Sequence, residues 1–199
     1  MEMIKTFIEI GTSDFDTCLD LVNKGNWMGV MVEPNPKCMD SIKKQVAESP
    51  HASNVQFVSE VISDFNGKIA FTTSRQDGEE WVRGISTVTA PSHRGERLFD
   101  YPENQLLIDE HLELPCITLN TLLARYEYEH INFLKIDTEG HELNILEAYD
   151  WEIKPDLIKV EHSHLDDMYL AMILKEQGYT VYKEETDLYL KAEGLIGVV

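Results

Sequence analysis

The stretch NFLKIDTEGHELNILEAYDW, residues 132–151, gathers several chemically active side chains at one point of the chain. An apolar run ends at Asp137, and Glu139, His141 and Glu142 follow before a helical pattern begins. Carboxylates and imidazoles at the tip of a buried strand can hold a cation, contact an ammonium group or accept a proton from a substrate. A simpler role for Glu139 and Glu142 is to cap the following helix, since acids are favoured in a first helical turn.

Five apolar, strand-like segments alternate with helix-length segments and must position these side chains. This alternation predicts one α/β domain over residues 1–199, with a mostly parallel sheet that is covered on both faces. Asn66-Gly67 predicts a hairpin between the third strand and a return strand, and residues 179–192 predict a terminal antiparallel hairpin. The five segments are residues 5–11, 27–33, 54–62, 131–137 and 156–162.

Each of the five predicted strands ends in a carboxylate. In open α/β sheets, ligands bind beyond the carboxyl ends of the strands, so these residues indicate a binding edge. The chain has 36 acids, and some of them would fall at strand ends by chance. The five carboxylates are Glu9, Glu33, Glu60, Asp137 and Glu161.

The first loop, GTSDFDT at residues 11–17, lacks the second and third glycines of a dinucleotide-binding fingerprint. Asp14 and Asp16 stand where the first helix should begin, with no Lys or Arg nearby. They complement the helix dipole, and they would repel a diphosphate. A nicotinamide oxidoreductase is therefore disfavoured, whereas a cationic cofactor is compatible with the loop.

Glu33 lies 22 residues after Gly11, where an acid is well placed to accept hydrogen bonds from both hydroxyls of a ribose. Glu60 is suited to an adenine amino group, and the apolar Val61 to the face of the ring. An adenosine without phosphates, next to an acidic loop, points to S-adenosylmethionine, whose sulfonium and ammonium groups are positively charged.

The formal net charge of −19 excludes classes of partner more firmly than it suggests any. A chain this acidic repels nucleic-acid phosphates and anionic membranes, so we expect neither as a partner. Cys18, Cys38 and Cys116 are scattered and odd in number, which favours reduced thiols. With no signal-peptide pattern at residues 1–11, we expect a cytoplasmic protein.

The segment FLKIDTEGHELNILEA, residues 133–148, resembles the central motif of the FkbM-type methyltransferases. IEIGTSDFDT falls where that family has its first cofactor loop, VEPNP where it has the ribose-binding acid, and FVSEVISDFNGKIAF where it has the third-strand segment. The resemblance extends from about residue 6 to 191, and PCITLNTLLARY and IKVEHSH continue it. Only the central motif is specific; the others support it by order and spacing.

The resemblance implies the class I methyltransferase fold, Rossmann-like, with a seven-stranded sheet whose last hairpin is reversed. The implied activity is S-adenosylmethionine-dependent O-methylation of a small molecule or glycan. The cofactor-binding residues that it implies are Glu9, Gly11, Thr12, Ser13, Glu33, Pro34, Glu60, Val61 and Asp137.

Phe15 departs from the family pattern, which usually has a second glycine at this position of the first loop. A bulky ring there would crowd the methionine end of the cofactor. This departure keeps open a second hypothesis, in which the chain is a catalytically silent, cofactor-binding or interaction protein.

Methyl transfer mainly requires that an acceptor hydroxyl be positioned and relieved of its proton. Asp137 and Glu161 end successive parallel strands, whose tips lie about 4.8 Å apart, so a cation between them would relieve their repulsion. With His162 they would hold a divalent metal, magnesium or manganese. Alternatively, Asp137 contacts the cofactor's ammonium and His141 or His162 acts as the base, or the two carboxylates share a proton.

Residues 72–104 form a long segment without strong periodicity, and we interpret it as an insertion on the acceptor side. It contains four of the chain's five arginines, which suit carboxylate, phosphate or sugar oxygens, and Trp81 would stack on a sugar. Equally, the arginines pair with Asp77, Glu79, Glu80 and Glu96. The four arginines are Arg75, Arg83, Arg94 and Arg97.

Overall fold

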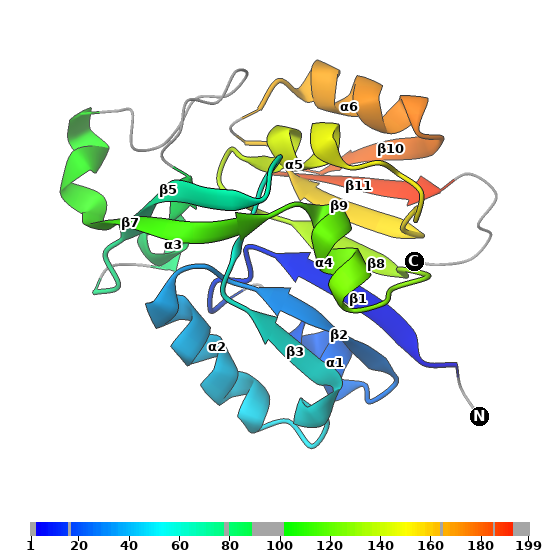
Figure 1. Ribbon diagram of the computed structural model, residues 1–199, viewed down its shortest axis with the longest axis horizontal. Coiled ribbons are helices and arrows are strands. Elements are labelled where there is room, and N and C mark those ends of the chain that lie inside the picture. Colours follow the sequence, from blue (N-terminus) through cyan, green and yellow to red (C-terminus); the bar gives the residue numbers. More distant parts are fainter. Residues whose placement is uncertain are drawn as a thin grey trace.

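The computed structural model describes residues 3–15, 17–77, 80–88, 102–163, 165–184 and 186–192. Its main element is a seven-stranded sheet with the order β10-β11-β9-β8-β1-β2-β3 (Figure 1). β11 runs antiparallel to both of its neighbours, and the other pairs are parallel. This arrangement confirms the predicted class I methyltransferase fold. The strands are β1 (Lys5–Ile10), β2 (Trp27–Val32), β3 (Val55–Val58), β8 (Phe133–Ile136), β9 (Leu157–Glu161), β10 (Tyr179–Glu184) and β11 (Asp187–Ala192).

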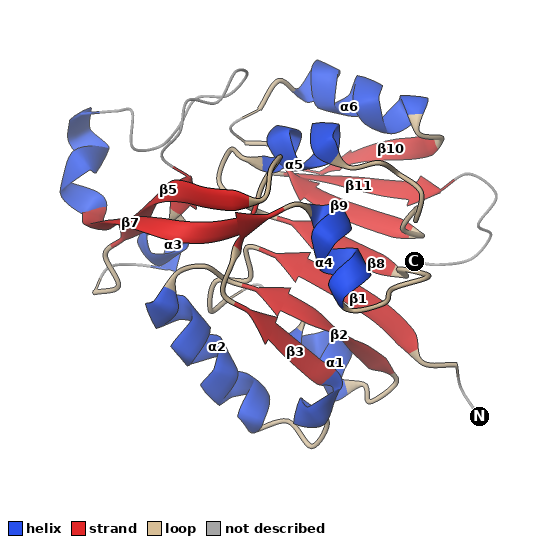
Figure 2. Ribbon diagram, in the orientation of Figure 1, coloured by secondary structure: helices blue, strands red, loops and turns tan. Residues whose placement is uncertain are grey.

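Helices cover both faces of this sheet because successive strand residues point to opposite sides. Phe7 of β1 is buried against α1 (Leu19–Asn23) and α2 (Pro36–Ala47), whereas Ile8 is buried against the layer on the other face. Burying one such side chain stabilises the fold by about 1.5–3 kcal/mol. The second layer consists of α4 (Leu119–Arg125), α5 (Glu142–Ala148) and α6 (Asp167–Glu176) (Figure 2).

Local sequence signals fix where these helices begin. Asn35 caps α2 by accepting a 3.0 Å hydrogen bond from the Lys37 N–H, and Pro36 occupies the first turn. Asp166 caps α6 in the same way. Across the described parts of the chain, no helix has the length and apolar character that crossing a membrane would require.

A second sheet of four strands lies beside the carboxyl ends of β1 and β2 (Figure 1). Its order is β4-β7-β5-β6, and β5 and β7 form a long antiparallel pair. The short helix α3 (Glu80–Gly84) and two 3₁₀ turns, η1 (Ala52–Asn54) and η3 (Pro102–Leu107), complete the described elements. The strands are β4 (Val61–Ile62), β5 (Gly67–Ser74), β6 (Thr87–Val88) and β7 (Ile108–Ile117).

The prediction of a hairpin at Asn66-Gly67 is wrong, because the strands on either side of this turn do not pair with each other. The expected third strand divides after Val58: β3 stays in the main sheet, and β4 joins the second sheet by pairing with β7. The return strand, β5, pairs with β7 and not with β3 or β4. The reason is a non-local competitor, since residues 108–117 form a ten-residue strand that offers β5 a longer partner.

Candidate active site

A cavity lies between the tips of β1, β2 and β8 and the second sheet, and we call it the sheet-tip cavity. Seven of the residues expected at the site line it, namely Gly11, Ser13, Glu33, Pro34, Val61, Asp137 and His141. The lining also includes Ile10, Val32, Cys38, Ile62, Phe71, Gly84, Ser86, Val88 and Thr138.

Gly11 brings the first loop directly against the tip of β8. Its φ is +79°, a left-handed conformation that favours glycine, and a Cβ on this residue would lie 1.7 Å from the Asp137 carbonyl oxygen. A side chain here would therefore separate the loop from β8. The glycine is required by backbone packing at the edge of the cavity.

Glu33 ties the first loop to the tip of β2. One carboxylate oxygen accepts a 2.7 Å hydrogen bond from the Ser13 N–H, and the other accepts one of 2.7 Å from the Asn35 N–H. Burial raises the pKa of Glu33 to about 7, against the opposing effect of these two hydrogen bonds. Each oxygen retains a second lone pair for a further donor. A role in binding ribose hydroxyls stays a prediction.

The first loop also contains polar atoms that the protein itself does not satisfy. Thr12 Oγ1, Ser13 Oγ and Asp14 Oδ1 are buried and have no hydrogen-bond partner among the described residues. Buried polar atoms are normally paired, so three successive exceptions need an explanation. Of these three residues only Ser13 lines the sheet-tip cavity, so a polar ligand in the cavity would offer a partner to the Ser13 hydroxyl.

Phe15 packs against α3 and is not among the residues that line the sheet-tip cavity. A Cβ on Gly84 would lie 2.8 Å from the Phe15 ring, and the Arg83 guanidinium lies 5.9 Å from the ring centroid. Asp14 adds an ion pair with Arg83 at 3.1 Å. The bulky residue in this loop thus serves as an anchor on the second sheet's helix.

Asp137 and Glu161 converge, as the sequence predicted. Ile136 and Val160 are partners in the register of β8 and β9, so the residues that follow them lie side by side. One carboxylate oxygen each from Asp137, Glu139 and Glu161 lie within 4.8 Å of one another. We call these three residues the acidic cluster.

Burial and mutual repulsion disfavour full ionisation of the acidic cluster. Burial raises the pKa of Asp137 to about 7, with the ammonium of Lys135 acting against this and Glu139 adding to it. Burial, followed by the charges of Glu139 and Asp137, raises the pKa of Glu161 to about 9. Lys135 Nζ lies 3.8 Å from an Asp137 oxygen. The cluster therefore favours a bound cation or a shared proton.

His162 does not join the acidic cluster, so the predicted Asp137–Glu161–His162 metal trio is not assembled. It follows Glu161 directly, and adjacent residues of an extended chain point to opposite faces. His162 Nδ1 lies 2.8 Å from an Asp167 oxygen at the start of α6. Within the described chain its buried Nε2 has no hydrogen-bond partner. Glu139 takes the third place instead.

The two glutamates after Asp137 have different roles. Glu142 accepts hydrogen bonds from the Thr138 N–H at 2.6 Å and from the Gly140 N–H at 3.0 Å, so it fixes the turn between β8 and α5, and its place in the first turn of α5 suits the helix dipole. Glu139 has a φ of +57°. This left-handed turn directs its side chain back to the strand tips, a consequence that spacing alone does not reveal.

His141 occupies the N-cap position of α5 without a side-chain capping hydrogen bond, lines the cavity, and contacts a residue that the sequence analysis left without a role. Its Nε2 lies 3.0 Å from Ser63 Oγ, and Ser63 Oγ donates a 2.9 Å hydrogen bond to Asp64. His141 and Ser63 are both buried. Ser63 follows β4, so the second sheet supplies this partner.

Glu9 and Glu60 are engaged away from the cavity. Glu9 is fully buried, accepts a hydrogen bond of 3.0 Å from the Cys18 N–H, and lies 3.4 Å from the ammonium of Lys135. Burial raises the pKa of Glu9. Glu60 forms an ion pair with Arg125. Like Thr12, Glu161 and His162, neither residue lines the cavity, and their expected contacts with a cofactor stay predictions.

The arginines of the expected insertion divide between two environments. Arg75 forms an exposed pair with Asp77, at 2.7 and 3.0 Å, as the pairing alternative predicted. Arg83 instead reaches Asp14 of the first loop. Arg94, Arg97, the side chain of Trp81 and Asp16 lie outside the described residues.

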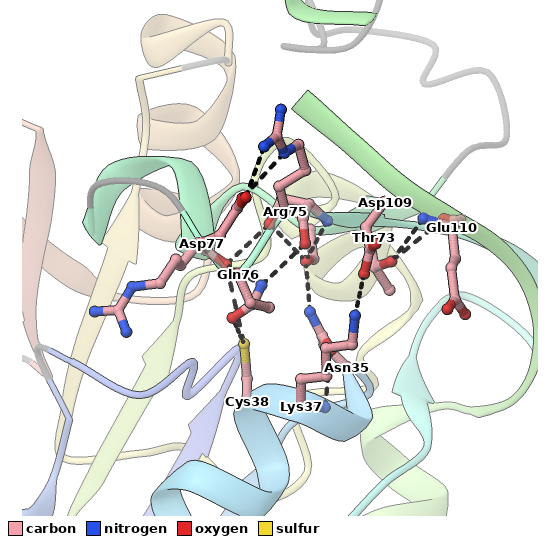
Figure 3. A network of polar contacts seen from close by, with 12 residues as sticks. Asn35, Lys37, Cys38, Thr73, Arg75, Gln76, Asp77, Asp109 and Glu110 are labelled. Carbon is pink, nitrogen blue, oxygen red and sulfur yellow. Dashed lines mark hydrogen bonds and ion pairs between the residues drawn. The ribbon is translucent and has the colours of Figure 1, made fainter. Parts of the chain in front are cut away.

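A polar network joins the start of α2 to the second sheet (Figure 3). The Asn35 amide that caps α2 also donates a 3.0 Å hydrogen bond to Ser86 Oγ. Cys38 Sγ lies 3.4 Å from a Gln76 oxygen, and Lys37 forms an ion pair with Asp109. These contacts hold the second sheet over the cavity. The position of the second sheet is therefore fixed by the protein's own side chains.

The sequence matches the FkbM methyltransferase domain family over residues 9–181. Among solved structures, an FkbM methyltransferase from Methylobacillus flagellatus KT is 14% identical with a TM-score of 0.58. The alignment covers 94% of this chain but only 43% of that protein, so the chain spans less than half of its length. No curated protein is similar enough to this chain to match it.

Two further solved structures align over 96% of this chain with lower scores. One is a precorrin-6y C5,15-methyltransferase from Geobacter metallireducens GS-15, at 16% identity, 80% coverage of that chain and a TM-score of 0.45. The other is M. capricolum TrmK in complex with S-adenosyl-homocysteine, at 12% identity, 65% coverage of that chain and a TM-score of 0.46.

Proposed function

Because the chain belongs to the FkbM methyltransferase domain family, we propose that it transfers a methyl group from S-adenosylmethionine to a hydroxyl of a small molecule or glycan. The observation that carries the proposal is the sheet-tip cavity, where Ser13 of the first loop, with an unsatisfied hydroxyl, meets Asp137 and His141. The loop needs polar partners, and the opposite wall offers groups that can accept a proton.

The cofactor fits the residues that are present. Gly11 and Ser13 would lie along it, Glu33 would accept from its ribose hydroxyls, and Pro34 and Val61 would contact its apolar parts. Arg83 is already paired with Asp14, so its positive charge is balanced and is not available to bind a diphosphate. When bound, the cofactor supplies an electrophilic methyl group on a sulfonium.

The protein's own residues then position the acceptor and handle its proton. Asp137 and His141 both line the cavity, so an acceptor hydroxyl between them would have two groups that can take a hydrogen bond. The neighbouring strands of the second sheet exclude water from one side. We propose a small-molecule or glycan hydroxyl as the acceptor, and neither nucleic acid nor a membrane as partner, since the chain carries a net charge of −19.

The acidic cluster supports two versions of this proposal. Its three carboxylates are oxygen ligands that suit magnesium or manganese, and they equally suit the cofactor's ammonium group. His162 does not contribute to either version, because it lies against Asp167. Titrations with manganese and magnesium, followed by thermal unfolding, distinguish the two versions. The metal version predicts a higher melting temperature before any cofactor is added, and Glu161→Gln should remove that rise.

Calorimetry with S-adenosylhomocysteine tests the central proposal. We expect binding of S-adenosylhomocysteine and none of NAD, followed by transfer of a labelled methyl group from S-adenosylmethionine to hydroxyl compounds. Binding of NAD without S-adenosylhomocysteine would leave the fold intact and remove the function.

A further inference from the structure

Ser86 and Thr87, at the start of β6, contact opposite walls of the sheet-tip cavity. Ser86 Oγ lies 3.0 Å from the amide nitrogen of Asn35, which follows the tip of β2. Thr87 Oγ1 lies 3.0 Å from the carbonyl oxygen of Glu139, in the turn that follows β8. Adjacent residues of an extended chain point to opposite sides, so one short segment of the second sheet reaches both strand tips.

The hydroxyl of Ser86 is fully engaged by the protein itself. Ser74 Oγ donates its single proton to the Arg83 carbonyl at 2.9 Å, so Ser86 is the donor in the 3.1 Å contact between the two serine hydroxyls. Ser86 Oγ also accepts from the Asn35 amide at 3.0 Å and from the Ser74 N–H at 3.1 Å. A hydroxyl has one proton and two lone pairs, so these three contacts fill its capacity. Although Ser86 lines the cavity, its hydroxyl therefore holds the wall and not a ligand.

Asn35 connects Ser86 to Glu33. The Asn35 side chain points from the start of α2 toward the second sheet (Figure 3). Its Oδ1 accepts from the Lys37 N–H at 3.0 Å, so the amide nitrogen is the end that faces Ser86. The Asn35 N–H donates to the Glu33 carboxylate, and Asn35 is 1% exposed. A displacement of Ser86 would therefore move the residue that holds Glu33.

Thr87 holds the turn that presents Glu139 to the acidic cluster. Its buried hydroxyl donates to the Glu139 carbonyl at 3.0 Å and lies 3.2 Å from the Thr138 carbonyl oxygen. Glu139 and Gly140 have φ values of +57° and +99°, so the turn contains two successive left-handed residues. Glu142 fixes this turn through the N–H groups of Thr138 and Gly140, and Thr87 fixes its carbonyl groups. The direction of the Glu139 side chain thus depends on the second sheet.

We infer that Ser86 and Thr87 are positioning residues for the proposed methyl transfer. Ser86 fixes the wall where Glu33 would receive the cofactor's ribose, and Thr87 fixes the acidic cluster where a cation would bind. This inference rests on the proposed function. Methyl transfer requires its reacting groups to be held in one geometry, and a ligand that spans the cavity needs both walls in place. One peptide unit joins the two residues, so the walls cannot separate without the loss of one of their contacts.

Calorimetry with three probes tests the inference without a known acceptor: S-adenosylhomocysteine, methylthioadenosine and manganese alone. Methylthioadenosine has the ribose and adenine of the cofactor but no ammonium group, so it reports on the Glu33 wall. Manganese, and the extra affinity of S-adenosylhomocysteine over methylthioadenosine, report on the acidic cluster.

Thr87→Val keeps the shape of the side chain and removes its hydroxyl. We expect it to lower one of the two readouts of the acidic cluster about fivefold, the effect of one hydrogen bond, and to leave the binding of methylthioadenosine unchanged. Thr87→Ser retains the hydroxyl and should restore the wild-type affinities. Ser86→Ala should weaken the binding of both nucleosides about fivefold and leave the binding of manganese unchanged.

Thr73→Val is the matched control, because Thr73 is a buried threonine of the same sheet that does not line the cavity. Its Oγ1 accepts a 3.1 Å hydrogen bond from the Glu110 N–H of β7, so this variant should bind all three probes as the wild-type protein does. Equal weakening in Thr73→Val and Thr87→Val would assign the effect to general loosening of the second sheet and overturn the inference.

Two further outcomes overturn the positioning roles. One is a Thr87→Val variant that weakens methylthioadenosine as much as the ligand of the acidic cluster, and the other is unchanged binding of every probe in both Thr87→Val and Ser86→Ala. In each case binding of the nucleosides by the wild-type protein would leave the proposed function in place. A wild-type protein that binds neither nucleoside would remove the proposed function and this inference with it.

Discussion

Glu33 and Glu161 are both carboxylates at the tips of parallel strands, yet their surroundings differ in kind. Glu33 accepts one backbone N–H on each oxygen, from Ser13 and Asn35. Glu161 lies beside two other acids, Asp137 and Glu139. Burial raises the pKa of Glu33 to about 7 and contributes most to the value of about 9 at Glu161, where neighbouring negative charge raises it further.

The difference shows that a strand-end acid can either fix the backbone by accepting its hydrogen bonds or form part of a site that a cation completes. At Glu33 the protein supplies the donors, so the carboxylate fixes the loop against which a cofactor would lie. At Glu161 like charges oppose ionisation, so a proton, a metal or an ammonium group must complete the site. The tip of β2, which we call the preorganised edge, is fixed by donors of the protein itself. The tips of β8 and β9 depend on what binds there.

Gly11→Ala should have the largest effect, because Gly11 brings the first loop into contact with the tip of β8. A Cβ would lie 1.7 Å from the Asp137 carbonyl oxygen, and the φ of +79° adds strain, so the loop must move away from β8. We expect a loss of about 3 kcal/mol or more in the free energy of unfolding, measured in urea, and no binding of S-adenosylhomocysteine.

Gly178→Ala is the matched control for this prediction. Its φ of +84° is nearly the same, but a Cβ there meets nothing within 4 Å. It should cost only the backbone strain of about 1–2 kcal/mol. Equal losses in the two variants would mean that the contact between the first loop and β8 contributes nothing.

Glu33→Gln should have the next largest effect, because it breaks the preorganised edge. The amide nitrogen would face either the Ser13 or the Asn35 N–H, so one buried donor meets another. We expect a loss of about 1–3 kcal/mol in the free energy of unfolding and weaker binding of S-adenosylhomocysteine. Glu113→Gln, at the exposed Lys68 pair, should change neither quantity appreciably; similar losses in both variants would remove the special role of Glu33.

Glu161→Gln should instead raise the free energy of unfolding, and this gain should depend on pH. Because the folded-state pKa of about 9 lies above the ordinary glutamate value of 4.5, the folded protein holds this proton more tightly than the unfolded chain. The free energy of unfolding therefore falls as pH rises from about 4.5 to 9. The variant should be more stable than the wild-type protein at pH 8 by on the order of 1–2 kcal/mol, and not at pH 4.

Chemical denaturation at the two pH values measures this effect without a metal or cofactor. Glu113→Gln is the control of opposite sign, since the Lys68 ammonium lowers the pKa of Glu113. Its carboxylate stabilises above its pKa, so this variant should gain nothing at pH 8. A wild-type protein whose stability rises between pH 4.5 and 8, with Glu161→Gln following it, would show that the acidic cluster is not repulsive.

The main sheet was predictable because its signals are local. The alternation of apolar strands and helices, the Asn35-Pro36 cap and the strand-end acids all lie within short windows of sequence, and they placed Glu33 and Asp137 correctly at one edge. The place of His162 was also open to prediction, since it follows Glu161 by one residue and must point the other way.

The second sheet depends on pairings between distant residues, and so it was missed. β4 and β6 are two residues long, too short for a periodic signal. β7 carries a periodic signal, since the apolar Leu112, Leu114 and Cys116 alternate with His111, Glu113 and Pro115. The contact between Ser63 and His141 follows only once β4 is placed beside β7.

The smallest expected effect is that of Arg83→Ala, which asks whether the second sheet supports the preorganised edge. The sequence left two roles open for Arg83, contact with an acceptor or a pair with a neighbouring acid of residues 72–104. The ion pair of Arg83 with Asp14 in the first loop gives a different expectation. Both groups are largely shielded, at 25% and 9% exposure, so the pair exceeds an exposed one in effect. We expect binding of S-adenosylhomocysteine to weaken about fivefold, near 1 kcal/mol.

Arg75→Ala is the matched control, because Arg75 pairs with Asp77 on the surface, whereas Arg83 pairs with Asp14 of the first loop. It removes the same charge from the same segment, and exposed pairs contribute little, so calorimetry should show unchanged binding. Equal weakening in both variants would assign the effect to net charge. Unchanged binding in both would show that Glu33 holds the loop without help from α3, and it would return Arg83 to the acceptor side of the cavity.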